Sequence, residues 1–366
     1  PELVADIAQN GIVLTGGGTA GHVTPNIALL PALQAAGYEI AYVGSYEGIE
    51  KKLIADFNIP YTGISTGKFR RYLDPKNFSD PFRVMKGFVE ARNYLKNYQP
   101  DVVFSKGGFV SVPVVRAAAS LHIPCIIHES DMTPGLANKL CIPVAEKVCC
   151  NFPETMKNIP ADKAVLTGSP IRAELAEGSK LAGLNMCGFT ANKPVIMVIG
   201  GSLGAANVNK AVRDALPKLL EDFQVVHLCG KDKIDNLLLN TPGYKQFEYI
   251  KAELKDIFAM ADVVISRAGA NAICELLALK KPNILIPLPA ASSRGDQLLN
   301  AASFEAQGYS IVLNEDDITT NLLVDKVHEL YFNRQNYVDA MSKSHQMDAV
   351  KTIMELINEA ADKKTN

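Results

Sequence analysis

The chain has 366 residues, of which 48% are hydrophobic and 21% are charged, the balance of an ordinary globular protein with a large core. Its net charge of −2 excludes an overall field that would attract nucleic acid or anionic lipid, so any basic surface is local. The length predicts about two domains. No apolar run approaches the ~20 residues of a membrane span, and no secretory signal is expected. The seven cysteines form no CxxC pair, which favours reduced, buried thiols over a metal site.

Strands and helices alternate from residue 12 onward, which predicts a parallel sheet with helices on both faces. The first half is expected to contain strands at 12–14, 40–43, 101–105, 123–128, 147–150 and 164–166, and helices at 25–36, 50–57, 82–97, 112–122 and 133–142. Residues 63–72 are expected to form a loop. Residues 170–192 are rich in Gly, Pro, Lys and Glu without an apolar period, which indicates a linker, placed at 174–192.

A second alternating set follows, again opening on strand, glycine turn and helix. It is expected to contain strands at 195–199, 224–229, 247–250, 262–266, 283–287 and 309–313, and helices at 206–221, 254–259, 271–279, 297–307 and within 321–362. The sequence therefore predicts an α/β protein of two Rossmann-like domains, 11–173 and 193–345, whose parallel sheets face each other across a cleft. A C-terminal helix in 346–366 is expected to pack back on the first domain.

The first glycine turn lies in the run IVLTGGGTAGHVTP, residues 12–25. Such a turn lets backbone N–H groups approach a ligand, and the helix that follows favours an anion. The glycines match the GxGxxG dinucleotide fingerprint, but the second strand ends without the expected acid until Glu47, so a nicotinamide oxidoreductase is a poorly supported alternative. His22 stands where the turn becomes helix and is a candidate general base, because its pKa is naturally near working pH.

In the second half, a strand ends at Ser266 and a helix begins within the run SRAGANAICE, residues 266–275. The N–H groups at 270–272, at the expected start of a helix, suit a diphosphate, and Glu275 suits a ribose diol. Taken alone, Glu275 is better explained as a helix-start acid that complements the helix dipole. The glycine turn at 200–204 and the polar run 292–297 offer further diphosphate and sugar contacts, which favours the ligand-binding interpretation.

Seven motifs occur in one order and together resemble the MurG family, the UDP-N-acetylglucosamine:undecaprenyl-pyrophosphoryl-N-acetylmuramyl-pentapeptide transferases of peptidoglycan synthesis. They are GGGTAGHVTP (16–25), DVVFSKGGFVSV (101–112), HESDMTPGLAN (128–138), GSPIR (168–172), GGSLGA (200–205), SRAGANAICE (266–275) and RGDQLLNA (294–301). The resemblance covers residues 11 to about 357 and implies the GT-B glycosyltransferase fold. It also implies inverting transfer of GlcNAc from UDP-GlcNAc to the 4-hydroxyl of lipid I, giving lipid II, without a metal or cofactor.

The resemblance assigns the donor mainly to the C-terminal domain and lipid I to the N-terminal domain, at the cytoplasmic face of the cell membrane, with other cell-wall synthesis proteins as further partners. The residues it implies for the donor are Thr19, Ala20, Gly21, Asp131, Arg172, Ser202, Ile250, Ala270, Asn271, Ala272, Glu275 and Gln297. Those it implies for the acceptor are Lys106, Gly107, Gly108 and Thr133. The alternative is another GT-B sugar-nucleotide enzyme, an epimerase or a glycolipid synthase.

Two positions depart from the family pattern. Many relatives have glycine where this chain has Ala20, and Gln-Asn where it has Ser130 and Asp131. Asp131 places a carboxylate where those relatives have a sugar-binding amide, so it joins His22 and Glu129 as a candidate base. An inverting transfer needs one such group to take the proton of the acceptor hydroxyl. The sequence leaves the choice among the three open.

Basic and aromatic side chains alternate at 68–72 and 78–88. The cations include Arg83, Lys86 and, between the two segments, Lys76. This mixture suits peripheral docking on anionic lipid. An epimerase would not need such a surface. An ordinary amphipathic helix with a solvated face explains the 82–97 segment equally well.

Overall fold

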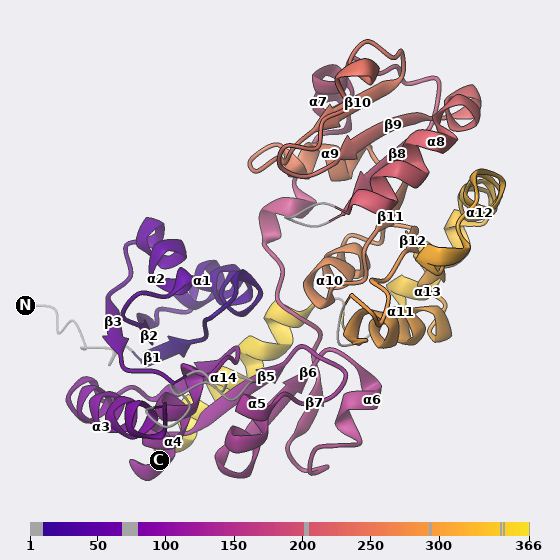
Figure 1. The fold of residues 1–366 in the computed structure, drawn as a ribbon. Helices are drawn as coiled ribbons and strands as arrows, with labels where there is room; N and C mark the ends of the chain where they lie inside the picture. The colour runs from indigo at the N-terminus through magenta and orange to yellow at the C-terminus, as the bar shows by residue number, and fades with distance from the viewer. Residues whose placement is uncertain are drawn as a thin grey trace, which may run out of the picture. The chain divides into compact units, whose positions relative to one another are not determined.

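The computed structural model describes residues 10–67, 80–200, 205–292, 295–344, 346 and 348–365, and Figure 1 draws its helices and strands. The chain divides into two compact units. Unit 1 consists of Pro1–Arg172 and Asp348–Asn366, and unit 2 of Ala173–Met347. Each unit is built on its own parallel sheet, so the prediction of two Rossmann-like domains is confirmed.

The sheet of unit 1 has seven strands among the described residues, ordered β3-β2-β1-β4-β5-β6-β7. The strands are β1 (Gly11–Thr15), β2 (Glu39–Ser45), β3 (Tyr61–Ile64), β4 (Val102–Ser105), β5 (Cys125–Glu129), β6 (Lys147–Cys150) and β7 (Ala164–Leu166). The helices are η1 (Ala20–His22), α1 (Thr24–Ala35), α2 (Ile49–Ile54), η2 (Ala55–Phe57), α3 (Asp80–Tyr98), α4 (Ser111–Ser120), α5 (Leu136–Cys141), η4 (Ile142–Val144), α6 (Pro153–Met156) and α14 (Ala349–Thr365).

Successive residues of each strand face opposite sides of this sheet, as the pleat requires. Val13 and Val103 belong to a core cluster shared with helices α3 and α4. Their neighbours Leu14 and Phe104 belong to a second cluster shared with α1 and α14. Both faces are therefore covered, which explains why these strands read as continuous apolar runs rather than alternating ones.

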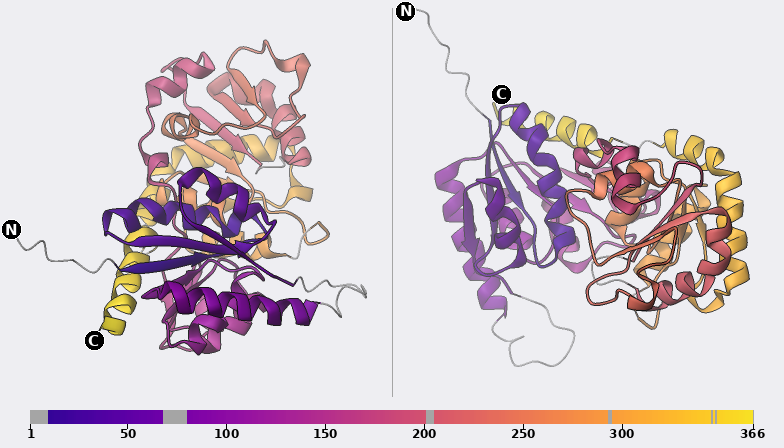
Figure 2. Two further views of the ribbon diagram at one scale, coloured as in Figure 1. Left: turned by 90° about the vertical axis from the view of Figure 1, so that its left-hand side faces the viewer. Right: turned by 90° about the horizontal axis from the view of Figure 1, so that it is seen from above.

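The last helix, α14, returns to unit 1 after the chain has completed unit 2. Ile353 and Ile357 are fully buried in the cluster that also contains Leu14. The Tyr38 hydroxyl donates to Asn358 Oδ1 over 2.8 Å, which adds a polar contact to the apolar one. Figures 1 and 2 show this yellow helix, which ends at the C mark, against the strands of unit 1.

The sheet of unit 2 has six described strands, ordered β10-β9-β8-β11-β12-β13. The strands are β8 (Val195–Ile199), β9 (Gln224–Leu228), β10 (Tyr244–Phe247), β11 (Val263–Ser266), β12 (Asn283–Leu285) and β13 (Ser310–Val312). The helices are η5 (Ala173–Ala176), α7 (Lys180–Cys187), α8 (Ala206–Asp222), η6 (Asn236–Leu238), α9 (Leu254–Met260), α10 (Ala270–Ala278), α11 (Asp296–Ala306), η7 (Glu315–Asp317), α12 (Thr320–Phe332) and α13 (Arg334–Ser342).

Three segments differ from the expected elements. Residues 174–192, expected to be a linker, contain η5 and α7 and belong to unit 2. There α7 packs on α9, and the Ser179 N–H donates to Asp256 Oδ1 over 2.7 Å, so contacts distant in sequence order a segment that lacks an apolar period. Strand β3 lies partly in the expected loop at 63–72, and β10 begins three residues before the strand expected at 247–250. Short edge strands carry few residues from which a period can be read.

The strand order places the loops that matter. In unit 1 the order reverses beside β1, whose neighbours are β2 and β4. In unit 2 it reverses in the same way beside β8, whose neighbours are β9 and β11. Open parallel sheets bind ligands at the carboxyl ends of the strands at such a reversal. Each unit therefore has its candidate site at the carboxyl ends of the strands around its central strand.

Candidate active site

In unit 1, His22 is held by the turn that precedes it. Its Nδ1 lies 2.9 Å from the Gly17 carbonyl oxygen and 3.2 Å from Thr19 Oγ1. A carbonyl only accepts, so Nδ1 carries the proton, and Nε2 is the ring atom able to take another. Burial, followed by the charge of Lys106, lowers the pKa of His22 below its ordinary value. The imidazole is therefore neutral at pH 7, the state that a general base needs.

The second glycine turn, after β4, packs directly on the first. The Gly17 N–H donates to the Gly107 carbonyl over 3.3 Å. Gly108 has a φ of +87°, and a Cβ there would overlap the Gly17 carbonyl oxygen. Only glycine permits this backbone conformation together with this approach. The exposed residues Thr19 and Ala20 form the tip of the first turn above this contact.

Lys106, predicted to bind the acceptor, has its ammonium inside unit 1. The residue is 1% exposed, and Nζ lies 2.9 Å from His128 Nδ1 and also donates to Ser130 Oγ. His128 Nε2 in turn donates to the Gly168 carbonyl over 2.8 Å. Burial and, to a smaller extent, the charge of Lys106 hold the pKa of His128 well below its usual range, so this ring is neutral. Lys106 and His128 thus connect the loops after β4, β5 and β7.

Glu129, one of the three candidate bases, has both carboxylate oxygens engaged. They accept from the Asp131 N–H at 2.8 Å, the Gly135 N–H at 3.1 Å and Asn138 Nδ2 at 2.8 Å. Burial raises the pKa of this carboxyl. The carboxylate closes the loop between β5 and α5, a structural task. Asp131 is half-buried on that loop, and Thr133 is exposed there.

A cavity of about 1,010 Å³ opens within unit 1 at the carboxyl ends of its strands. The first glycine turn and His22 line one part of it, and Ser65 and Thr66 line another. Arg83 and Lys86 contribute cations from α3. The cavity is larger than one sugar ring needs. Its lining combines a candidate base with the cations Arg83 and Lys86 and the acidic residues Glu47 and Glu50, so it suits a polar substrate that contains a sugar.

In unit 2, the turn after β11 leads directly into α10. Ala270, Asn271 and Ala272 are the first three residues of this helix, so their N–H groups lie at its amino end, the end that favours an anion. Glu275 is half-buried on the next turn, and Ile250 is half-buried just beyond the end of β10. Ser202 lies outside the described residues. Arg172 is half-buried as the last residue of the first segment of unit 1.

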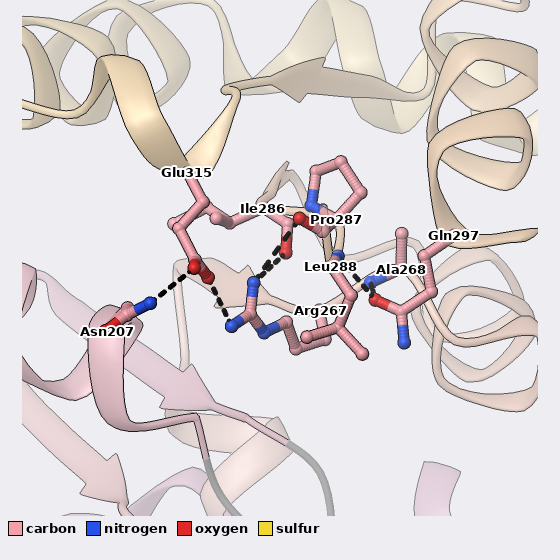
Figure 3. A network of polar contacts seen from close by, with 8 residues as sticks. All are labelled: Asn207, Arg267, Ala268, Ile286, Pro287, Leu288, Gln297 and Glu315. Carbon is pink, nitrogen blue, oxygen red and sulfur yellow. Dashed lines mark hydrogen bonds and ion pairs between the residues drawn. The ribbon is translucent and has the colours of Figure 1, made fainter. Parts of the chain in front are cut away.

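Gln297, at the start of α11, uses one end of its amide to join two loops. Its Oε1 accepts from the Ala268 N–H at 3.3 Å and the Leu288 N–H at 3.0 Å. These bonds orient the amide and direct Nε2 away from the two backbone donors (Figure 3). A side chain held in this way offers a substrate a hydrogen-bond donor rather than an acceptor.

Unit 2 also contains a buried ion pair that the sequence did not predict. Arg267 pairs with Glu315, and both side chains are 9% exposed. The guanidinium also donates to the Ile286 carbonyl at 3.1 Å and the Pro287 carbonyl at 3.4 Å (Figure 3). Glu315 Oε1 accepts from Asn207 Nδ2 at 2.6 Å.

The pair therefore connects the loops after β11, β12 and β13 with the start of α8. Arg267 belongs to the SRAGANAICE motif, but Glu315 lies in an acidic run that resembles a solvated surface. No local pattern links the two positions. Only the order of the strands brings their loops together.

Among the described residues, no group of three or more His, Cys, Asp or Glu side chains could hold a metal ion. All seven cysteines are buried free thiols, as expected. No helix in the described part of the chain is long and apolar enough to cross a membrane.

Comparisons with known proteins agree with this architecture. Residues 12–150 match the glycosyltransferase family 28 N-terminal domain, and residues 195–357 match the glycosyltransferase family 28 C-terminal domain. A protein of Lachnospira eligens is 64% identical over 348 residues, which cover 95% of this chain and 98% of that protein. It is named UDP-N-acetylglucosamine--N-acetylmuramyl-(pentapeptide) pyrophosphoryl-undecaprenol N-acetylglucosamine transferase.

Solved structures give the same result. The MurG crystal structure from Acinetobacter baumannii is 29% identical, with a TM-score of 0.75 over 96% of this chain and 99% of that one. A putative UDP-N-acetylglucosamine 2-epimerase from Listeria monocytogenes has a TM-score of 0.69 over 97% and 98% of the two chains. Its identity is 12%, so that likeness shows the fold alone.

Two Rossmann-like units that match the N-terminal and C-terminal domains of glycosyltransferase family 28 define a glycosyltransferase of the GT-B type. The 64% identity to the Lachnospira eligens transferase, across nearly the whole of both proteins, identifies the family within that class. The chain belongs to the MurG family of N-acetylglucosamine transferases.

Proposed function

We propose that this chain transfers GlcNAc from UDP-GlcNAc to the 4-hydroxyl of the MurNAc residue of lipid I, forming lipid II. The observation that carries the proposal is the full-length 64% identity to a transferase named for this reaction. The start of α10 in unit 2 and the first glycine turn in unit 1 supply what the reaction needs, a place for a nucleotide diphosphate and a neutral base. No observation favours the epimerase or glycolipid synthase alternative over this one.

Unit 2 binds the donor in this proposal. The N–H groups of Ala270–Ala272 bind the diphosphate, where negative charge builds as the sugar leaves. Glu275 accepts from the ribose hydroxyls, Gln297 Nε2 donates to a GlcNAc hydroxyl, and the backbone at Ile250 pairs with uracil. Ser202, Arg172, Asp131 and residues 19–21 stay predicted donor contacts.

Unit 1 binds the acceptor, with the sugar in the cavity beside His22. Gly107, Gly108 and Thr133 stay predicted acceptor contacts, while Lys106 supports them from beneath through His128 and Ser130. His22 Nε2 takes the proton of the 4-hydroxyl as the oxygen attacks the anomeric carbon opposite the UDP leaving group. The geometry favours His22 over Glu129, whose carboxylate oxygens already accept three hydrogen bonds.

The test is UDP release from UDP-GlcNAc with and without a short-chain lipid I analogue. We expect release that depends on the acceptor and yields one disaccharide product per UDP. Release without acceptor and without a new glycoside would instead indicate hydrolysis or epimerisation and would contradict the proposal.

Glu275→Ala is expected to weaken UDP-GlcNAc binding about 10- to 100-fold, the loss of hydrogen bonds to a charged group. Because the ribose is remote from the reacting carbon, kcat at saturating donor should change much less than KM. Calorimetric titration of UDP-GlcNAc measures the affinity directly. Glu305→Ala is the matched control, since Glu305 is exposed on α11 of the same unit. Unchanged affinity in Glu275→Ala would remove Glu275 from the donor site.

We also propose that unit 1 docks on the cytoplasmic face of the membrane, where lipid I is anchored and other cell-wall synthesis proteins are available as partners. The supporting observation is an exposed apolar stripe on α3. Phe82 is 79% exposed, Met85 64% and Val89 50%. Arg83 and Lys86 are exposed beside this stripe, which adds attraction to anionic lipid. The basic and aromatic residues of the expected surface that fall within 68–79, including Lys76, lie outside the described residues.

Phe82→Ser combined with Met85→Ser should lower the fraction of protein that sediments with vesicles containing anionic phospholipid at least about tenfold. Burying one large apolar side chain is worth about 1.5–3 kcal/mol, and two are removed. Activity on a water-soluble acceptor without vesicles should stay unchanged. Phe332→Ser is the control, because Phe332 is 77% exposed on unit 2. Equal loss from the control would show that the stripe has no special role.

A further inference from the structure

Glu50 is a buried carboxylate beside the first glycine turn. The proposed transfer reaction assigns it no role. It lies on α2 and is 1% exposed. It accepts from the Ser45 N–H at 2.9 Å, from Ser45 Oγ at 2.5 Å and from the Gly18 N–H at 3.2 Å. The first two bonds anchor the carboxylate to the end of β2, and the third directs it at the turn after β1.

The Gly18 N–H and the Gly17 C=O belong to one amide group. The carboxylate of Glu50 accepts from the nitrogen side of this amide, at 3.2 Å. The imidazole of His22 meets its oxygen side through Nδ1, at 2.9 Å. Glu50 and His22 are therefore joined through a single peptide bond. Amide resonance couples the two ends, so a negative charge at the N–H makes the carbonyl oxygen a stronger acceptor.

The packing around this amide leaves no room for side chains. A Cβ on Gly17 would overlap the carboxyl group of Glu50 on one side. A Cβ on Gly108 would overlap the Gly17 carbonyl oxygen on the other side and crowd His22 Nδ1. The contacts from carboxylate to amide and from amide to imidazole are therefore direct, and glycines at both positions permit them.

We propose that Glu50 is a positioning residue for the transfer: through the Gly17–Gly18 amide it fixes His22 as the Nδ1–H tautomer and increases the proton affinity of Nε2. The inference rests on the proposed function in taking His22 as the base. It resembles the carboxylate that orients a catalytic histidine in hydrolases, with a peptide group inserted between the two side chains.

The groups around His22 shift its pKa in opposite directions. Burial and the ammonium of Lys106 lower the pKa of His22, whereas the bond to Gly17 and the charge of Glu50 raise it. His128, the other titratable ring nearby, is neutral and adds no charge. Glu50 therefore offsets part of the effect of Lys106 and keeps the neutral imidazole basic enough to accept a proton.

Glu50→Gln is the first test, because glutamine keeps the shape but has one acceptor oxygen and an NH₂ group that faces a donor. We expect kcat to fall about 10- to 100-fold, the usual effect of removing a partner that orients a histidine. KM for UDP-GlcNAc should not change, and the acid limb of the kcat profile should move to lower pH. Glu39→Gln is the matched control, exposed at the amino end of the strand that carries Ser45, and should behave as wild type.

The second test reads His22 without any reaction, by ¹⁵N NMR of histidine-labelled protein, with His22→Gln to assign the signal. Neutral wild-type His22 should be the Nδ1–H tautomer, and Glu50→Gln should lower its titration midpoint. A wild-type Nε2–H tautomer, or an unchanged midpoint and kcat in Glu50→Gln, would overturn the inference. This measurement stands even if the protein proves not to transfer GlcNAc, so the two failures are distinguishable.

If Glu50→Gln does not fold, Glu50→Asp keeps the charge but withdraws the carboxylate from the Gly18 N–H by one methylene. We expect it to lose kcat and to shift the His22 tautomer while its melting temperature stays near that of wild type. Wild-type kcat and tautomer in Glu50→Asp would contradict a role through the amide.

Discussion

His22→Ala is expected to lower kcat about 10²- to 10⁴-fold, the range that a general base contributes. KM for UDP-GlcNAc should stay within about twofold, because a base acts on the acceptor hydroxyl in the transition state and not on donor binding. UDP release with a saturating short-chain lipid I analogue measures both constants. Equal loss of kcat and kcat/KM would identify an interaction made only in the transition state.

The pH dependence follows from the direction of the pKa shift. The base must be unprotonated, and burial lowers the pKa of His22 below 6.5. Wild-type kcat should therefore be level through pH 7 and fall only as the pH drops below that ordinary value. This limb should be absent from the residual activity of His22→Ala. An acid limb that persists unchanged in the variant would belong to another group.

Two variants control the His22 result. His122 is exposed on unit 1 with a φ of 58°, so His122→Asn suits its backbone and should leave kcat unchanged. Asp131→Ala tests the remaining candidate. If it loses more activity than His22→Ala while donor affinity persists, Asp131 is the base and His22 only orders the turn.

Arg267→Ala is expected to destabilise unit 2 by about 3–5 kcal/mol, because the buried Glu315 carboxylate would lose its cation. A loss of this size lowers the melting temperature of a unit of this length by roughly 6–20 °C. The hydrogen bonds from Arg267 that join the loops after β11 and β12 would also be lost. Because these loops position Gln297 and the start of α10, both would be displaced. UDP-GlcNAc affinity should fall in consequence. Calorimetric melting and donor titration measure the two effects.

The matched control removes both charges. Arg267→Met with Glu315→Leu leaves no buried charge uncompensated, so it should recover most of the lost stability. Donor affinity should stay reduced, because the bonds to Ile286 and Pro287 are still missing. Lys326→Ala breaks an exposed pair with Glu329 on α12 and should cost about 1 kcal/mol or less. A double variant as unstable as Arg267→Ala alone would show that the ion pair is not the cause.

The fold was predictable because its signals are local. Buried parallel strands such as β4 and β8 appear as short apolar runs, and glycines follow both strands in the sequence. The helix at 180–187 was missed because its order depends on Asp256, far along the chain. The sites followed from the turns, since a strand, a glycine turn and a helix start define where an anion binds regardless of the rest of the molecule.

The class of the protein, its two parallel sheets and the positions of the turns that line its sites could all be inferred from the amino-acid sequence. It also identified His22 and the 270–275 run as candidates from their neighbours alone. Which side chains contact those turns depends on the three-dimensional fold. It directed Lys106 inward to His128, brought Glu50 to the amide that holds His22, and paired Arg267 with Glu315. The physical reason is that backbone conformation depends on adjacent residues, whereas the partner of a buried charge depends on which loops the strand order brings together.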